Sequence, residues 1–342
     1  MTKMTQMRRE IAEIPDAAAR LLDASGGALT AAGKHLRDLS PRFLTTVARG
    51  SSDHAASFLK YAVELSAGVP VASLGPSIAS IYGAKLRLLG SACISVSQSG
   101  KSPDIVAMAE GARAGGALTI GLTNTAGSPL AATSDHAIDI MAGAETSVAA
   151  TKSFVNSALA GLLLLAHWTD DEELLAALHR LPAHFQDAID CDWMEIGAAL
   201  SGETSLFILG RGPSTAIAAE AALKFKETCS KHAEAYSAAE VMHGPLALVG
   251  PGFPVLALAA RDASEASIAA AADTLAGKGA AAFITSRLSK QAAMLPHAAT
   301  GHPLTDPLAL IVSFYAFVEA FAVRLGLNPD QPPNLRKVTE TL

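Results

Sequence analysis

The chain has 342 residues, half of them hydrophobic and 17% charged, so it is long enough to bury large cores in about two domains. The formal net charge of −6 and the pI near 5.9 argue against a nucleic-acid partner, although an acidic protein can still hold a small anion at a local site. The amino terminus lacks an apolar signal core, and the longest apolar run, residues 158–168, is too short to span a bilayer, so we expect a cytoplasmic protein without membrane contact.

The first half of the chain alternates short apolar runs with helical segments. Residues 7–40 are predicted to form helices, with breaks at Pro15 and at the Gly26–Gly27 pair, that pack on the first domain. Five strands are then expected at residues 43–48, 69–74, 92–97, 118–123 and 136–141. Strands alternating with helices in this way are typical of a parallel sheet with helices on both faces.

The second half repeats this pattern after a small-residue loop and two helices. The loop is expected at residues 142–152, the helices at 153–169 and 170–190, and the domain junction between about residues 180 and 200. Further strands are predicted at 205–209, 253–260 and 281–286, and further helices at 215–231, 263–276 and 306–325, before a Pro-rich tail.

An internal repeat relates the two halves. The segment VARGSSDHAA from residue 47 aligns without gaps with LGRGPSTAIA from residue 209, so that Gly50 matches Gly212 and Ser52 matches Ser214. Each segment follows an apolar strand and opens a helix, which indicates a duplicated α/β domain. Because open α/β sheets bind ligands at the carboxyl ends of their strands, we expect the first domain to grip the ligand and the second to supply the chemistry.

A hydroxyl-rich turn, Ser97-Gln98-Ser99-Gly100-Lys101-Ser102, joins the third strand to a helix. Hydroxyl and amide side chains next to the free N–H groups of a helix start suit a phosphate, and the turn Gly50-Ser51-Ser52 would complete the cradle. The alternative is a simple helix cap by Ser102 or Asp104, which needs only one such residue. The spacings of a P-loop, a dinucleotide fingerprint and a G-x-S-x-G nucleophile elbow are all missing.

The helix that includes Glu220, Lys224 and Glu227 carries the second candidate site. Steps of four and three residues place these side chains on one helix face, and the positions between them are mostly apolar or small. Charges in a mostly buried helix are usually paired or functional, so a salt-bridged helix and a proton-transfer site both remain open. The equivalent helix of the first copy lacks this triad, which favours the proton-transfer site.

The cysteines and histidines give no metal signal. The three cysteines lie far apart, and no histidine pair has metal-ligand spacing, so we expect reduced, structural thiols and no metal.

Six segments together resemble the SIS (sugar isomerase) family, in particular the isomerase half of glucosamine-6-phosphate synthases. They are ARGSS, SQSGKSPD, AETSVAATKSF, GRGPSTAIAAEAALKFKE, HAEAYSAAEVMHGPLAL and NLRKVTETL, and they follow the family's order over nearly the whole chain. The resemblance implies an α/β fold of two tandem SIS domains, each a five-stranded parallel sheet flanked by helices in a flavodoxin-like three-layer sandwich. We expect a helical lead-in at residues 1–40, SIS domains at 41–185 and 195–327, and a tail at 328–342 that closes the site.

The resemblance also implies residue roles. Glu227 would move a proton between C1 and C2 of the sugar, with Lys224 and Glu220 lining the site and orienting Glu227. His243 would assist ring opening from the partner subunit of a homodimer, and Lys337 would engage the open-chain sugar. The backbone around Val148 would contact sugar hydroxyls. The phosphate of a hexose or amino-sugar 6-phosphate would be held by Ser52, Ser97, Gln98, Ser99 and Ser102, with no cofactor.

These roles predict an enzyme that converts glucosamine 6-phosphate and water to fructose 6-phosphate and ammonia. The chain begins directly at the isomerase half, and Met1-Thr2 offers no glutaminase cysteine, so we expect no internal ammonia source. A fructosamine-6-phosphate deglycase and a galactosamine-6-phosphate deaminase/isomerase are the alternatives. A non-catalytic sugar-phosphate sensor is less favoured, because the chain lacks a basic DNA-binding segment and keeps Glu227, His243 and Lys337.

Overall fold

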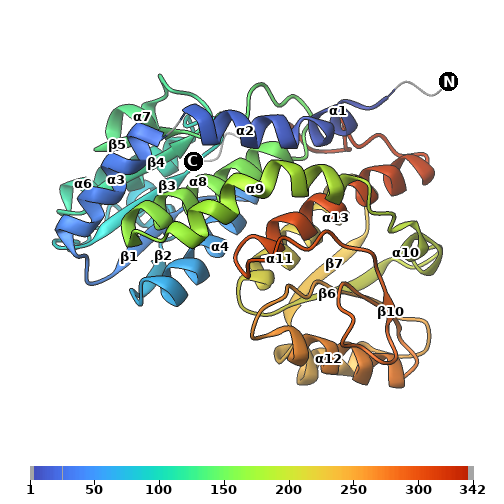
Figure 1. Ribbon diagram of the computed structural model, residues 1–342. Coiled ribbons are helices and arrows are strands. Elements are labelled where there is room, and N and C mark those ends of the chain that lie inside the picture. The colour runs from blue at the N-terminus through green and yellow to red at the C-terminus, as the bar shows by residue number, and fades with distance from the viewer. Residues whose placement is uncertain (1–3, 25, 338–342) are drawn as a thin grey trace. The chain divides into compact units, whose positions relative to one another are not determined.

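The computed structural model describes residues 4–24 and 26–337, which form two compact units, each built on one five-stranded parallel sheet (Figure 1). The β1–β5 unit comprises Asp16–Glu145 and Lys152–His179. The β6–β10 unit comprises residues 4–15, Thr146–Thr151 and Arg180–Lys337. The predicted α/β fold with one parallel sheet per domain is therefore confirmed.

In the β1–β5 unit the strand order is β2-β1-β3-β4-β5, and every neighbouring pair is parallel. All residues of the three central strands are buried, as expected for a sheet covered by helices on both faces. Its strands are β1 Leu44–Val47, β2 Val71–Ser73, β3 Ala92–Val96, β4 Leu118–Thr123 and β5 His136–Asp139. Its helices are α2 Ile14–Ala24, α3 Gly26–Leu39, α4 Ser51–Ser66, α5 Ser77–Ser80, α6 Pro103–Ala114, α7 Pro129–Thr133 and α8 Lys152–Thr169.

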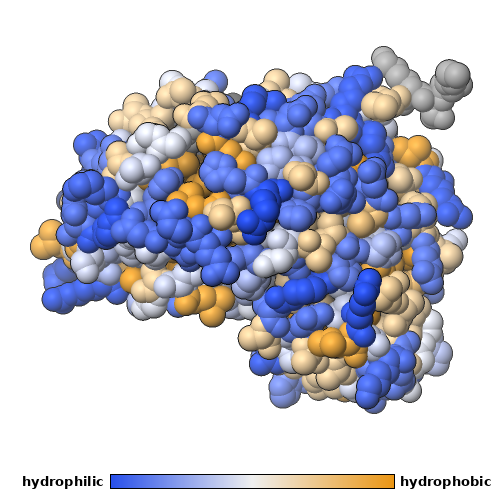
Figure 2. Space-filling view, in the orientation of Figure 1, coloured by the Kyte–Doolittle hydropathy of each residue, from blue (hydrophilic) through white to orange (hydrophobic). Residues whose placement is uncertain are grey.

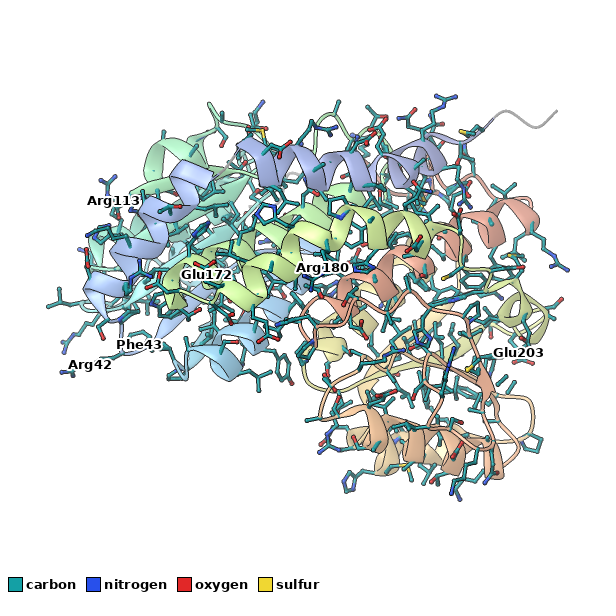
Figure 3. The ribbon with its side chains drawn as sticks, viewed as in Figure 1. Arg42, Phe43, Arg113, Glu172, Arg180 and Glu203 are labelled. Carbon is teal, nitrogen blue, oxygen red and sulfur yellow. The ribbon has the colours of Figure 1, made fainter. Side chains whose placement is uncertain are left out.

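The edge of this sheet is tied to the helix beside it. Arg113, near the end of α6 and labelled in Figure 3, forms an ion pair with Asp135 at 3.2 Å. Asp135 also accepts hydrogen bonds from the backbone N–H and the hydroxyl of Thr119 on β4. These contacts fix the start of β5 against β4.

In the β6–β10 unit the strand order is β10-β9-β8-β6-β7, again all parallel. Its strands are β6 Ser205–Gly210, β7 His232–Ser237, β8 Pro254–Ala257, β9 Ala281–Ile284 and β10 Ala293–Met294. Its helices are α1 Gln6–Ala12, α10 Met194–Ala199, α11 Pro213–Cys229, α12 Glu265–Gly277 and α13 Asp306–Arg324, with short 3₁₀ turns η1 Glu240–Met242 and η2 Gly244–Leu248. Helix α9, Glu172–Ile189, belongs to the β1–β5 unit up to His179 and to this unit from Arg180.

The duplication predicted from the sequence is present in the backbone. The order β2-β1-β3-β4-β5 of one sheet corresponds strand by strand to the order β7-β6-β8-β9-β10 of the other, so the two sheets have the same topology. Gly50 and Gly212 precede α4 and α11 with nearly equal dihedrals, φ 55° and ψ −134° against φ 58° and ψ −137°. A positive φ is easily adopted by glycine alone, which explains why both copies of the turn carry one.

Helix α13 is the core helix of the β6–β10 unit. Among the described residues it is the one helix long and apolar enough to cross a membrane, but it is largely buried, and it packs against α11. Phe225 of α11 meets Phe314 and Phe317 of α13, with ring centroids 5.2 and 6.2 Å apart. On the face shown in Figure 2, hydrophobic residues are interspersed among hydrophilic ones. The apolar character of α13 is thus explained by packing inside the unit.

Parts of the chain depart from the sequence-based expectations. Strands β7 and β10 and helices α7 and α10 were not predicted. The lead-in was expected to pack on the first domain, but its first helix, α1, packs against α13 in the other unit. Arg8 of α1 forms an ion pair with Glu319 of α13 at 2.5 Å, which fixes this contact. The next two helices behave as expected, because α3 packs against α8 and Asn156 of α8 donates to the carbonyl oxygen of Ala17 in α2.

Candidate functional site

Helix α11 carries three charged side chains in contact with one another. The ammonium nitrogen of Lys224 donates to Glu227 Oε2 at 2.5 Å and lies 3.3 Å from Glu220 Oε1. The side chains of Glu220 and Lys224 are fully buried, whereas that of Glu227 is 18% exposed. Of the two carboxylates, only that of Glu227 is therefore open to a ligand.

Lys224 keeps its charge in this buried position. Burial by itself lowers the pKa of Lys224, but the carboxylates of Glu220 and Glu227 more than offset it, so that the pKa is raised above its ordinary value. Lys224 therefore places a positive charge against the carboxylates of Glu220 and Glu227.

Tyr315 of α13 completes this cluster. Its hydroxyl donates to Glu220 Oε1 at 2.9 Å. Glu220 is therefore held by the ammonium group of Lys224 on its own helix and by the neutral hydroxyl of Tyr315 on α13. Edge-to-face contacts of Phe225 with Phe314 and Phe317 keep α11 and α13 together at this point. Sequence reasoning missed Tyr315, because 95 residues separate it from Glu220.

The hydroxyl-rich turn 97–102 lies in the β1–β5 unit, between β3 and α6. Ser97 Oγ accepts from the N–H of Gly100 at 3.2 Å, and Ser99 Oγ accepts from the N–H of Lys101 at 3.3 Å. Ser102 is the N-cap residue of α6, but its side chain makes no capping hydrogen bond. Gly50 is the N-cap residue of α4 and has no side chain to offer.

These two helix starts lie at the same edge of the sheet, since β1 and β3 are paired parallel neighbours. Neither start is capped by a side chain, so the structure removes the simple helix cap as an explanation for Ser102. The alternative cap, Asp104, is fully buried and forms an ion pair with Arg49, which joins the two turns. Uncapped helix N-termini beside hydroxyl groups form an environment suited to an anion.

Gly100 is required by the shape of this turn. Its φ is +62°, and a Cβ atom there would lie 2.2 Å from Ser128 Oγ. Ser128 in turn caps α7 by accepting from the N–H of Ala131. The turn is therefore closely packed on the start of α7.

The other predicted site residues of the β6–β10 unit come from segments outside α11. His243 is exposed between η1 and η2, and within the described part of the chain its imidazole makes no hydrogen bond. Lys337 is half-buried and is the last residue described. Val148 is half-buried in the 146–151 loop of the β6–β10 unit. Their roles in binding and catalysis stay predictions, as do those of the α11 residues and of the serine turns.

Nothing in the described ranges indicates a metal centre: no group of three or more His, Cys, Asp and Glu side chains there is placed to hold an ion. The three cysteines are free thiols, and burial raises the pKa of Cys229 to about 11.

The fold and the repeated strand–turn–helix units define a protein of the duplicated, parallel α/β class. The model of the SIS domain family matches residues 41–167 and 199–324. The chain belongs to the SIS domain family.

Curated relatives are longer than this chain. The isomerizing glutamine–fructose-6-phosphate aminotransferase of Symbiobacterium thermophilum is 32% identical over 97% of this chain and 58% of its own length. The chain thus spans about three fifths of that relative. The same enzyme from Leifsonia xyli matches with equal identity and coverage.

Solved structures match over nearly the full chain. A proposed phosphosugar isomerase from Silicibacter pomeroyi DSS-3 is 57% identical, with a TM-score of 0.93 over 96% of this chain and 100% of that one. The C-terminal domain of glucosamine-fructose-6-phosphate aminotransferase from Francisella tularensis is 25% identical, with a TM-score of 0.84 over 97% and 99%. The glucosamine-6-phosphate deaminase of Thermotoga maritima shares the fold, with a TM-score of 0.78 at 19% identity and coverage of 98% and 100%.

Proposed function

We propose that this protein is a phosphosugar isomerase that converts glucosamine 6-phosphate and water to fructose 6-phosphate and ammonia. The observation that carries the proposal is the α11 cluster, in which a buried, charged Lys224 holds the partly exposed carboxylate of Glu227. Membership of the SIS family and the likeness to isomerizing aminotransferases support a sugar phosphate as substrate.

The proposed reaction moves two hydrogens within the substrate and then adds one water. Glu227 removes the proton from C2 of the open-chain amino aldose and returns it to C1, while one proton passes from the C2 amino group to O1. The aldehyde thereby becomes a hydroxymethyl group, and the C2 amine becomes an imine. Water adds to this imine, and ammonia leaves as the C2 ketone forms. Glu227 fits this role because a base must contact the substrate, and the fully buried Glu220 does not.

Recognition of the 6-phosphate is assigned to the serine turns of the β1–β5 unit. Ser52, Ser97, Gln98, Ser99 and Ser102 would donate hydrogen bonds together with free N–H groups at the starts of α4 and α6. The support is that both helix starts lack a side-chain cap. Arg49 adds little free charge, because it is paired with Asp104. Lys337 and His243 of the partner subunit would engage the open-chain sugar and assist ring opening in a homodimer.

A substrate panel tests the proposal. Purified protein is incubated with glucosamine 6-phosphate, galactosamine 6-phosphate and fructosamine 6-phosphate, and both ammonia and ketose or aldose phosphate are measured. We expect glucosamine 6-phosphate to be turned over fastest, with equal yields of ammonia and fructose 6-phosphate. Faster turnover of either other substrate would favour the corresponding deaminase or deglycase.

Two variants test the residue assignment in the same assay. Glu227→Gln should abolish most ammonia release, and Lys337→Ala should reduce it. Tight binding of sugar phosphates without turnover of any of them, in wild-type protein and variants alike, would favour a sugar-phosphate sensor over an enzyme.

A further inference from the structure

Helix α1 lies outside both segments that match the family model, yet it contacts three separate parts of the β6–β10 unit. Arg8 forms an ion pair with Glu319 of α13. Asp330, in the segment that leads to Lys337, accepts from the backbone N–H groups of Gln6 and Met7, each at 2.8 Å. The third contact is made by Glu10 with the 146–151 loop.

Glu10 is fully buried, and one of its carboxylate oxygens accepts hydrogen bonds from two residues of this loop. Oε1 accepts from the N–H of Thr146 at 2.5 Å, from the Thr146 hydroxyl at 3.2 Å and from the N–H of Ser147 at 3.3 Å. Hydrogen bonds to an ionised acceptor are roughly twice as strong as neutral ones.

A second hydrogen bond holds the loop on the C-terminal side of Val148. The hydroxyl of Ser147 donates to the carbonyl oxygen of Ala149 at 3.2 Å, so both neighbours of Val148 are fixed. Within the described part of the chain, the N–H and the carbonyl of Val148 itself form no hydrogen bond. Val148 is a half-buried residue, and backbone N–H and carbonyl groups are strong hydrogen-bonding groups, so these two are suited to a ligand.

We propose that Glu10 is a positioning residue, which holds the 146–151 loop so that the peptide groups of Val148 bind the hydroxyl groups of the sugar. This inference rests on the proposed function for the identity of the ligand. It assigns a role in sugar binding to a helix that precedes both SIS domains. Glu10 acts through the loop and does not itself touch the substrate.

The expected effect is specific to the sugar part of the ligand. The serine turns assigned to the phosphate belong to the β1–β5 unit, and Glu10 makes no recorded contact with them. Loss of a hydrogen bond to a charged group costs about 1.5–3 kcal/mol, which is roughly a tenfold to hundredfold loss of affinity. Contacts made equally to substrate and transition state affect KM rather than kcat.

Calorimetry with two ligands tests this. Glucitol 6-phosphate carries the hydroxyls and the phosphate but has no carbonyl, so it cannot be turned over, and inorganic phosphate carries no hydroxyl chain. We expect Glu10→Ala to weaken glucitol 6-phosphate about tenfold or more and to leave inorganic phosphate within about twofold. Glu10→Gln, which keeps an acceptor oxygen, should recover part of the affinity. Asp16→Asn, at an exposed carboxylate in the first turn of α2, is the matched control and should change neither.

The outcomes separate this inference from the proposed function. Equal weakening of both ligands, or unchanged binding of glucitol 6-phosphate, would overturn the role of Glu10. Failure of wild-type protein to turn over any amino-sugar phosphate would overturn the proposed function while leaving the binding comparison valid. Where Glu10→Ala does not fold, Glu10→Gln carries the test, with KM expected to rise and kcat to stay within about twofold.

Discussion

Glu220 and Glu227 are two carboxylates on one helix that differ in what surrounds them. Glu220 is buried between Lys224 and Tyr315, and Glu227 keeps part of its side chain open. The sequence spacing predicted that both share a face with Lys224, and this contact is confirmed. It could not distinguish their exposure, because exposure depends on α13, which follows α11 by many residues.

Exchanging each carboxylate for its amide separates a catalytic from a supporting role. We expect Glu227→Gln to lower kcat about 10²- to 10⁴-fold, as for loss of a general base, with little change in thermal stability. Glu220→Gln should destabilise the fold more and lower kcat less, because it weakens a buried charge pair. Ammonia release and thermal unfolding of both variants measure this. A larger loss of kcat in Glu220→Gln would reverse the assignment.

Lys224 stabilises the fold by compensating buried negative charge. Lys224→Met leaves Glu220 buried without its cation and should destabilise the protein by about 3–5 kcal/mol, measured by urea unfolding. The double variant with Glu220→Gln should recover part of this loss. A free energy of unfolding that is unchanged in Lys224→Met would show that the pair adds nothing to stability.

The pH dependence of this stabilisation follows from the raised pKa of Lys224. A group whose pKa is higher in the folded state contributes fully below its unfolded value, about 10.4 for lysine, and the contribution is lost as pH rises through the folded pKa. Wild-type stability from this pair should therefore be constant from neutral pH to about 10 and fall at higher pH. In Lys224→Met this alkaline decline should be smaller.

At the scale of elements, the starts of α6 and α7 offer a matched comparison. Ser128 caps α7 with its side chain, whereas Ser102 stands at the cap position of α6 without doing so. We expect Ser128→Ala to cost about 1 kcal/mol and Ser102→Ala less than about half of that. Ser102→Ala should instead weaken phosphate binding, measured by calorimetry. Destabilisation by Ser102→Ala with unchanged phosphate affinity would restore the helix cap as its role.

The central strands and both edge strands of the β1–β5 unit could be predicted from the sequence, whereas the edge strands of the β6–β10 unit could not. β1, β3 and β4 are buried along their whole length and appear as continuous apolar runs. β7 and β10 are edge strands, and residues such as His232 and Glu234 face solvent, so they carry no apolar run. The serine turn and the α11 triad were found because their residues are close in the sequence. Contacts such as Tyr315 with Glu220 or Glu10 with Thr146 join distant segments and left no pattern to detect.

At the scale of the whole molecule, the two sheets share one strand order but differ in the turns that follow their strands. Gly50 and Gly212 keep the same backbone, while the hydroxyl-rich turn occurs in one unit and the charged helix in the other. Each unit is thus assigned one part of the proposed reaction. The predicted homodimer adds the requirement that His243 of the partner subunit serves the site.

Mixed dimers test that requirement. Glu227→Gln and His243→Ala chains, each inactive alone, are co-expressed with different affinity tags. In random two-fold dimers roughly a quarter of all sites would combine an intact Glu227 with an intact His243 from the other chain, so about a quarter of wild-type activity should return. Absence of any recovered activity in isolated mixed dimers would place both residues of a site on one chain.

The contacts of α1 also bear on how the protein is made. The hydrogen bond from Gln6 to Asp330 joins residues 324 positions apart, so α1 leaves the ribosome long before its partner exists. At about 5–20 residues per second this interval is roughly 15–65 seconds. During it, the β1–β5 unit can fold, while the buried carboxylate of Glu10 and the apolar side of α1 stay without their final neighbours. The β6–β10 unit is therefore expected to complete its fold only after residue 330 has left the ribosome, and nascent chains paused before residue 330 should be sensitive to proteases at α1.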